Sequence, residues 1–433
     1  MNLRRALVIF LALGLPFNPA GAQLTVQILK GMAESVPIAI VPLAWDGAGP
    51  PPYDVAATVH ADLERSGRFR PLPRAQIVEQ PHAASEVDVA DWRMLKIDYV
   101  LVGRLAAMPD GRYEIRYELV SVANGERLLG TAVPVDPKAL KRASHRISDA
   151  VYERILGVRG AFATRIAYVA VEGAVNRRSY RLIVSDADGA NERIVFGSPD
   201  PIMSPSWSPD GKSIAYVSFH SGLSAIYVQT LATGAQVQVS AKSGINGAPA
   251  FSPDGSQLAL ALSRKDGNVD VYVLTLASQD LKRVTDDASI DTEPVWAPDG
   301  RSLYFTSDRA GAPQVYQVGI EPSARARRVT FEGGYNARPR LSPDGRHLAV
   351  VTLDRGAYRI GIVDTKQGGM QVLSSGQQDE SPSFAPNGAD ILYTSRTGGR
   401  DTLAIVSSDG RIQQQVASSA GEVREAAWSP FLN

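Results

Sequence analysis

The sequence predicts a mainly β protein in which a small α/β domain precedes a C-terminal six-bladed β-propeller. The first observation is a five-residue motif, clearest as Trp207-Ser208-Pro209-Asp210-Gly211, whose copies begin 44, 45, 45, 43 and 44 residues apart. A repeat of this length holds about four short strands, which is one propeller blade. The second observation is that residues 36–156 hold no copy and mix helical with strand patterns. The later copies begin at Phe251, Trp296, Leu341, Phe384 and Trp428.

The composition of the chain limits its class. Its 433 residues are 44% hydrophobic, which is enough for two hydrophobic cores. Lys plus Arg and Asp plus Glu are balanced at 45 each, so we expect no nucleic-acid partner. The chain has no cysteine, which excludes disulfides, a thiol nucleophile and a lipid-modified cysteine.

The first 22 residues have the pattern of a secretory signal peptide. Arg4 and Arg5 precede an apolar run over residues 6–15, and small residues at 20–22 form a cleavage site after Ala22. The apolar run is shorter than the ~20 residues that a membrane-spanning helix needs. We therefore expect an exported chain that begins at Gln23 and is not inserted in the membrane.

The N-terminal domain, residues 23–156, is predicted to have the order β-α-β-α-β-β-β-α. The first element of the domain is a short apolar strand, and Asp54 and Asp88 are positioned to cap two helices. Asp136 before Pro137 marks the start of the last helix, because proline is tolerated at the first helical position. The strands are expected at residues 38–41, 69–72, 99–105, 113–120 and 127–135. Residues 157–164 form a linker too short to be a flexible tether.

The propeller is expected over residues 165–433. In each motif, Ser-Pro-Asp-Gly is a type I turn sequence, so the motif marks a hairpin tip between two strands. Residues 165–169 form a second strand with no motif before it, and Trp428-Ser429-Pro430 is a first strand with no second strand after it. Together the two ends complete a sixth blade, which closes the ring and removes exposed sheet edges. The aromatic residue at each motif head is expected to pack between blades.

The loops that lead into the innermost strands are the predicted binding surface. A proline lies two positions before five of the six motif heads, as Pro205 does before Trp207, and proline suits the first residues of a strand. The polar segments just before these prolines should surround one mouth of the channel, and loops of this kind often carry binding residues.

A search for catalytic and metal-binding patterns gives no candidate. The Gly-x-Ser-x-Gly pattern of serine hydrolases is absent, and Ser206 stands where a phosphate-binding loop needs glycine. Asp186-Ala187-Asp188-Gly189 is interpreted as a turn rather than a calcium loop. The five histidines lack the spacing of metal ligands. They are His60, His82, His145, His220 and His347. We therefore predict no metal, and with no other pattern found we predict no cofactor or catalytic residue.

The mature chain resembles the TolB family of the Tol-Pal envelope system over nearly its whole length. The resemblance rests on the signal peptide, the small α/β domain, the repeated Pro-x-[Trp/Phe]-Ser-Pro-Asp-Gly, the sequence Asn-Gly-Ala-Pro-Ala-Phe at 246–251, and Thr292-Glu293-Pro294. Leu341 and Asn387 depart from the repeat. The resemblance implies a monomeric, non-enzymatic periplasmic protein that supports outer-membrane integrity and invagination at cell division.

The resemblance also implies two binding sites. The lipoprotein Pal would bind at the propeller mouth, and TolA would bind the mature N-terminus. The implied Pal residues are Asn246, Ala248, Thr292, Glu293, Arg338 and Glu380. The implied TolA residues are Gln23, Leu24, Thr25, Val26, Gln27, Ile28 and Leu29. The alternative is a propeller hydrolase acting on peptides or glycans, which would need convergent titratable side chains in the channel.

Overall fold

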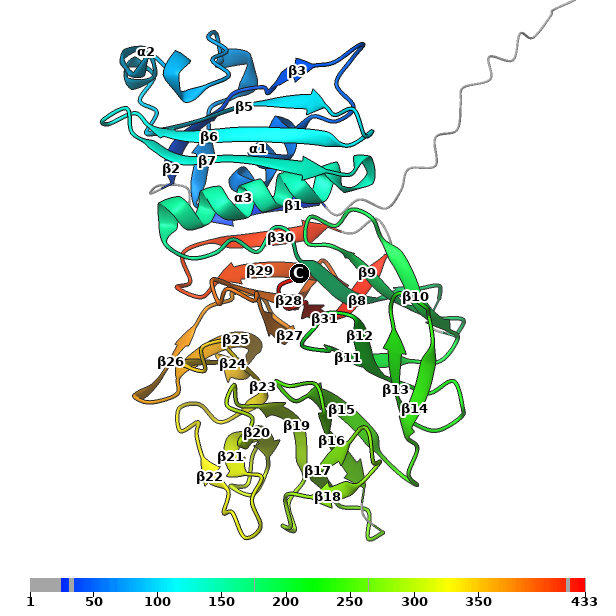
Figure 1. Ribbon diagram of the computed structural model, residues 1–433. Coiled ribbons are helices and arrows are strands. Elements are labelled where there is room, and N and C mark those ends of the chain that lie inside the picture. The colour runs from blue at the N-terminus through cyan, green and yellow to red at the C-terminus, as the bar shows by residue number, and fades with distance from the viewer. Residues whose placement is uncertain (1–24, 31–34, 175, 264, 418–420, 433) are drawn as a thin grey trace, which may run out of the picture.

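A computed structural model of the chain describes residues 25–30, 35–174, 176–263, 265–417 and 421–432. The predicted signal peptide, residues 1–22, lies outside the described residues, as do Gln23 and Leu24. Figure 1 shows the N-terminal domain at the top and the propeller below it, with helix α3 (Leu140–Leu156) lying between them. Within the described residues, no helix is both long and apolar enough to cross a membrane.

The N-terminal domain is one mixed sheet with helices on both faces. Its strands have the order β4-β2-β5-β6-β7, β3 pairs with β5, and β2 runs parallel to β4 and β5. Alternate residues of β2 face opposite cores: Ile38 and Ile40 pack with α1 and α3, whereas Ala39 packs on the side of α2. The elements are β2 (Val36–Ile40), β3 (Ala44–Asp46), α1 (Val55–Arg65), β4 (Phe69–Pro71), α2 (Val89–Met94), β5 (Tyr99–Ala107), β6 (Tyr113–Ser121) and β7 (Arg127–Val135). Short 3₁₀ turns cover Arg74–Gln76, Ala84–Glu86 and Pro137–Ala139.

The predicted helix starts are confirmed in two cases and shifted in the third. The Asp54 carboxylate accepts the N–H of Ala57 at 2.9 Å, and the Asp88 carboxylate accepts that of Ala90 at 2.9 Å. After Asp136 the chain first makes a 3₁₀ turn, and α3 begins only at Leu140. Asp136 makes no side-chain capping bond, which leaves the first turn in the tighter 3₁₀ form.

The propeller has six blades of four antiparallel strands, as predicted. Each blade begins with its innermost strand, and the next three follow outward (Figure 1). Five blades are continuous in sequence: β11 (Ile202–Trp207), β12 (Ser213–Ser218), β13 (Ala225–Thr230) and β14 (Gln236–Ser240); β15 (Asn246–Phe251), β16 (Gln257–Ser263), β17 (Val269–Thr275) and β18 (Leu281–Arg283); β19 (Asp291–Trp296), β20 (Ser302–Ser307), β21 (Gln314–Gly319) and β22 (Arg327–Arg328); β23 (Asn336–Leu341), β24 (His347–Asp354), β25 (Ala357–Asp364) and β26 (Gly368–Val372); β27 (Asp379–Phe384), β28 (Asp390–Thr397), β29 (Arg400–Ser407) and β30 (Gln413–Ala417).

The sixth blade joins the two ends of the propeller. Its inner strand is β31 (Glu422–Trp428), which pairs with β8 (Arg165–Glu172), followed outward by β9 (Ser179–Asp186) and β10 (Arg193–Ser198). Trp428 lies opposite Ile166, so the final copy of the motif is the first strand of a blade whose second strand opens the propeller. The predicted ring closure is confirmed.

The motif is a hairpin tip, and its aromatic head packs between blades, as predicted. The Asp210 carboxylate accepts the Ser208 hydroxyl at 2.6 Å and the N–H of Lys212 at 3.0 Å, while Gly211 has φ +66°. The buried Trp207 indole donates to the carbonyl of Ala427 in the neighbouring blade at 3.0 Å. Asp210 is therefore part of the scaffold.

The first described segment belongs to the propeller sheet and not to the N-terminal sheet. Strand β1 (Thr25–Lys30) pairs antiparallel with β30, the outermost strand of its blade, with Val26 opposite Val416. We expected residues 23–156 to form one domain. The difference arises because β30 offers an open edge of backbone N–H and C=O groups that one more strand can satisfy.

The linker is held to both domains. The Asp149 carboxylate on α3 accepts the N–H groups of Phe162 and Ala163 at 2.7 and 3.3 Å. The Trp428 indole donates to the Thr164 hydroxyl at 2.8 Å. These bonds restrict the orientation of the two domains.

Candidate functional site

The innermost strand of every blade contains the same distortion. One residue in each takes a left-handed conformation, with φ between 46° and 56°, and the pairing register shifts at that point. A left-handed conformation costs a non-glycine residue roughly 1–2 kcal/mol, so packing around the channel must maintain it. These channel-ring residues are Ser204, Ala248, Glu293, Arg338, Ser381 and Glu425.

The channel ring brings side chains of distant blades into contact. The Arg338 guanidinium lies 3.1 Å from Glu293 in the preceding blade and 3.3 Å from Glu425 two blades further on. Arg338 also donates to the Ser381 hydroxyl. An arginine can reach carboxylates on both sides only if it extends across the channel. We call Glu293, Arg338 and Glu425 the channel ion bridge.

The electrostatics of the channel ion bridge favour the charged form of Arg338. The carboxylate of Glu425, with that of Glu293, raises the pKa of the Arg338 guanidinium above its ordinary value, although burial acts to lower it. Glu293 also accepts the N–H of Arg338 and the hydroxyl of Thr306, each at 2.9 Å. Both carboxylates are thus engaged with one cation. This arrangement partly compensates the buried charge of the channel.

The residues implied for Pal binding divide into supporting and surface positions. The Asn246 side chain is 1% exposed and accepts the hydroxyl of Ser240 and the N–H of Lys242, so it shapes the entry loop from inside. Asp291, Asn336 and Asp379 occupy the same first position of their strands and are equally buried. Ala248, Glu293 and Arg338 belong to the channel ring. Thr292 and Glu380 are half-buried beside it.

Exposed apolar side chains surround the same mouth, and the sequence did not single them out. Ile245 and Ile290, each about half exposed, directly precede the buried Asn246 and Asp291. Phe331 is 71% exposed in the loop that leads to β23. The set, which we call the apolar rim, comprises Leu223, Ile245, Ile290, Phe331 and Tyr358. Ile245 and Ile290 occupy equivalent positions in the repeat, and this recurrence is the sequence signal that could have identified them.

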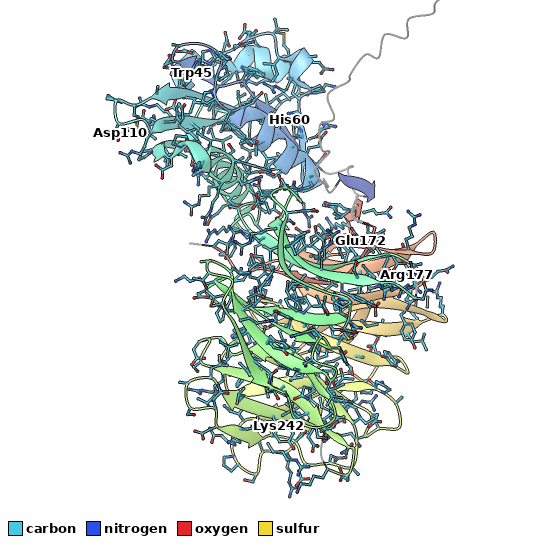
Figure 2. All side chains as sticks on the ribbon, turned by 90° about the vertical axis from the view of Figure 1, so that its right-hand side faces the viewer. Trp45, His60, Asp110, Glu172, Arg177 and Lys242 are labelled. Atoms are coloured by element: carbon cyan, nitrogen blue, oxygen red, sulfur yellow. The ribbon has the colours of Figure 1, made fainter. Side chains whose placement is uncertain are left out.

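One entry loop of the mouth lies far from the N-terminal domain. Lys242, in the entry loop of β15, lies on the part of the propeller remote from Trp45 and Asp110 (Figure 2). A cluster that could hold a metal ion, His145, Asp186 and Asp188, lies instead at the junction of the two domains. The mouth and the junction are therefore separate candidate sites.

The comparisons with known proteins cover both domains. The chain matches the TolB amino-terminal domain over residues 24–128 and the TolB beta propeller domain over residues 152–432. It is 50% identical over 432 residues to the Tol-Pal system protein TolB of Xanthomonas euvesicatoria, covering 99% of this chain and 98% of that one. The corresponding protein of Xanthomonas oryzae is 50% identical over 422 residues, with 96% of each chain covered.

A solved structure agrees with the fold. The crystal structure of TolB from Acinetobacter baumannii is 39% identical, covers 94% of this chain and 100% of its own, and superposes with a TM-score of 0.86. The resemblance inferred from the motifs is thereby confirmed. With both domains matched and close relatives aligned from end to end, the chain belongs to the TolB family of Tol-Pal system proteins.

Proposed function

We propose that this protein is a periplasmic, non-enzymatic interaction protein that binds Pal at the propeller mouth and TolA through residues 23–29. By joining these partners it would support outer-membrane integrity and invagination at division. Membership of the TolB family supports this role in general. The observation that carries the Pal assignment is the apolar rim.

The apolar rim has the composition of a protein-binding surface. Full burial of an exposed large apolar side chain gains about 1.5–3 kcal/mol, and Ile290 and Phe331, which are partly exposed, would each gain part of this on contact with a partner. Tyr335 packs edge-on against Tyr358 with ring centroids 5.3 Å apart, which holds part of the surface in place. A rigid surface loses less entropy on binding. Thr292 and Glu380 add polar groups between the apolar side chains.

The N-terminal segment has the properties of a strand that can be shared with a partner. The backbone of residues 25–30 pairs with the edge of β30, and the addition of a strand to a sheet edge is a common mode of peptide recognition. We therefore propose that residues 23–29 pair with TolA through their backbone groups. Of these, Gln23 and Leu24 lie outside the described residues.

Calorimetric titration of the mature protein with soluble Pal tests the mouth. We expect Ile290→Asp and Ile245→Asp each to weaken binding by about tenfold or more, equivalent to about 1.4 kcal/mol. Thr292→Arg should also weaken it. The matched control is Val237→Asp, because Val237 is 60% exposed on the outer strand β14.

Two results would contradict this assignment. If the unmodified protein shows no detectable Pal binding, Pal is not its partner. If Ile290→Asp and Ile245→Asp bind Pal as tightly as the unmodified protein does, the apolar rim is not the binding surface. Glu293 is a poor test position, because its replacement also breaks the channel ion bridge. Turnover of a peptide or glycan panel by the pure protein would favour the hydrolase instead.

A further inference from the structure

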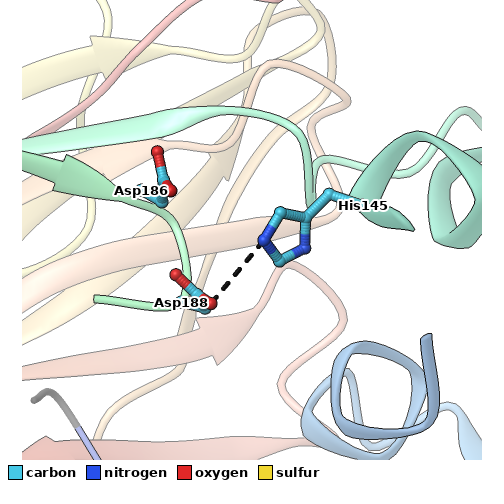
Figure 3. Close-up of side chains that lie close together, drawn as sticks. All are labelled: His145, Asp186 and Asp188. Carbon is cyan, nitrogen blue, oxygen red and sulfur yellow. Dashed lines mark ion pairs between the residues drawn. The ribbon is translucent and has the colours of Figure 1, made fainter. Parts of the chain in front are cut away.

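Three metal-ligating side chains from both domains meet at the domain junction. His145 comes from α3, Asp186 ends β9, and Asp188 lies in the turn after it (Figure 3). One ligand atom from each lies within 4.8 Å of the others. Helix α3 belongs to the N-terminal domain and β9 to the propeller, so an ion held here would contact both domains.

The orientation of His145 is fixed by a buried carboxylate. The Nδ1 atom of His145 lies 2.6 Å from Oδ2 of Asp62, and both side chains are almost completely buried. Asp62 is held in turn by the hydroxyl of Ser148 at 2.8 Å and the guanidinium of Arg65 at 2.9 Å. Because a carboxylate accepts hydrogen bonds, Nδ1 carries a proton, so Nε2 is the nitrogen that could bind a metal ion.

The Nε2 atom of His145 points into the acidic pair. It is buried, and no hydrogen-bond partner for it exists within the described part of the chain. The nearest charged atom is Oδ2 of Asp188 at 3.6 Å, the dashed contact in Figure 3. A metal ion between them would coordinate the buried nitrogen and the carboxylate together. Metal-binding histidines commonly donate their other ring N–H to a carboxylate, as His145 does to Asp62.

The two aspartates are positioned by the turn that carries them. Asp188 accepts the N–H of Ala190 at 3.0 Å, and Asp186 accepts the side-chain amide of Asn191 at 2.7 Å. These hydrogen bonds hold both carboxylates beside His145.

We propose that His145, Asp186 and Asp188 form a binding site for a divalent transition metal ion, with Zn²⁺ as the best match. An imidazole nitrogen with two carboxylates suits zinc, which takes four nitrogen, sulfur or oxygen ligands, and leaves one position for water. Calcium and magnesium prefer six or more oxygen ligands. An ion bound here would connect α3 to the sixth blade.

Lys141 competes with the metal ion for Asp188. Its ammonium lies 2.8 Å from Oδ2 of Asp188, and its side chain is 26% exposed, so it can turn toward solvent when an ion enters. This competition lowers the affinity of the site for the metal ion and offers a specific test. Removal of the lysine charge should strengthen metal binding, whereas a purely structural ion-pair cluster would show no such gain.

The experiment is calorimetric titration of the mature, chelator-treated protein with Zn²⁺, paired with thermal unfolding with and without the ion. We expect one equivalent to bind and to raise the unfolding temperature, because an ion that binds only the folded state stabilises it. Asp186→Asn and His145→Gln should each weaken binding at least tenfold, and Lys141→Gln should tighten it. The glutamine at position 145 can still donate to Asp62.

The matched control is His220→Gln, because His220 packs against Phe196 and Tyr227 in the propeller, outside the cluster. It should bind Zn²⁺ as the unmodified protein does. Any of three results overturns the proposal: no saturable heat, unchanged affinity in both Asp186→Asn and His145→Gln, or unchanged affinity in Lys141→Gln. Should His145→Gln fail to fold, Asp186→Asn and Lys141→Gln decide the question.

Discussion

Among single residues, Asp149 makes the clearest contribution to the pH dependence of folding stability. This buried carboxylate on α3 holds residues 162 and 163 by their backbone N–H groups, and burial raises its pKa to about 6. An aspartate in the unfolded chain has a pKa near 3.9. Between these two values the folded protein holds a proton that the unfolded chain releases.

The free energy of unfolding should therefore gain from Asp149 as the pH falls from 7 to 4, by about 2 kcal/mol. In Asp149→Asn the side-chain oxygen still accepts the N–H of Phe162, but the titration is removed. Urea denaturation of both proteins from pH 7 to pH 4 measures the difference, in which other titrating groups cancel. We expect the unmodified protein to gain stability relative to the variant at low pH. Parallel stability curves would contradict this.

Single residues also show where sequence interpretation ends. The spacing placed Asn246 in a mouth loop, but sequence alone does not show that its amide points inward to Ser240 and Lys242. The channel ion bridge was equally invisible, because Glu293, Arg338 and Glu425 are far apart in the chain and meet only when the ring closes. The sequence does not distinguish a buried polar side chain that supports a loop from an exposed one that can bind a partner.

At the level of helices and strands, local signals were reliable, whereas strands β1 and β3 left no signal that predicted them. Asp54 and Asp88 cap their helices, and the motif turns form the predicted hairpins, because these features depend on neighbouring residues. The three-residue strand β3 has too few positions to show a pattern. The pairing of β1 with β30 joins segments at opposite ends of the chain, so no local pattern reports it.

Deletion of residues 23–29 tests the separate role of β1. The propeller should still fold, with only a small decrease in its unfolding temperature, because β30 keeps its pairing with β29. Pal binding should be unchanged and TolA binding lost. Circular dichroism, thermal unfolding and titration with each partner measure the three quantities. Equal loss of both partners would show that the segment is structural.

At the scale of the whole molecule, the two unmatched ends of the repeat correctly predicted how the ring closes. Strand β31 pairs with β8, and its Val423 and Ala426 belong to the core between the last two blades. The family and the fold followed from the period and spacing of the motif. The relative placement of the domains did not, because it depends on contacts such as the 3.0 Å ion pair of Arg68 with Asp409.

A chain that ends at residue 421 should lose cooperative unfolding. It would lack β31, expose the edge of β8 and lose the core contacts of Val423 and Ala426. Thermal unfolding followed by light scattering should show a broad transition with aggregation. The deletion of residues 23–29 is the matched control, because it removes an edge strand but leaves the ring closed. A sharp transition near that of the unmodified protein would contradict the need for closure.

The left-handed residue in each innermost strand and the motif head three positions later have separate roles. The head, such as Trp207 after Ser204, packs between blades. The residue at the distortion contributes to the channel instead, where the six blades already carry serine, alanine, glutamate and arginine. Charge along the axis is therefore carried by residues separate from those that form the hydrophobic core between blades.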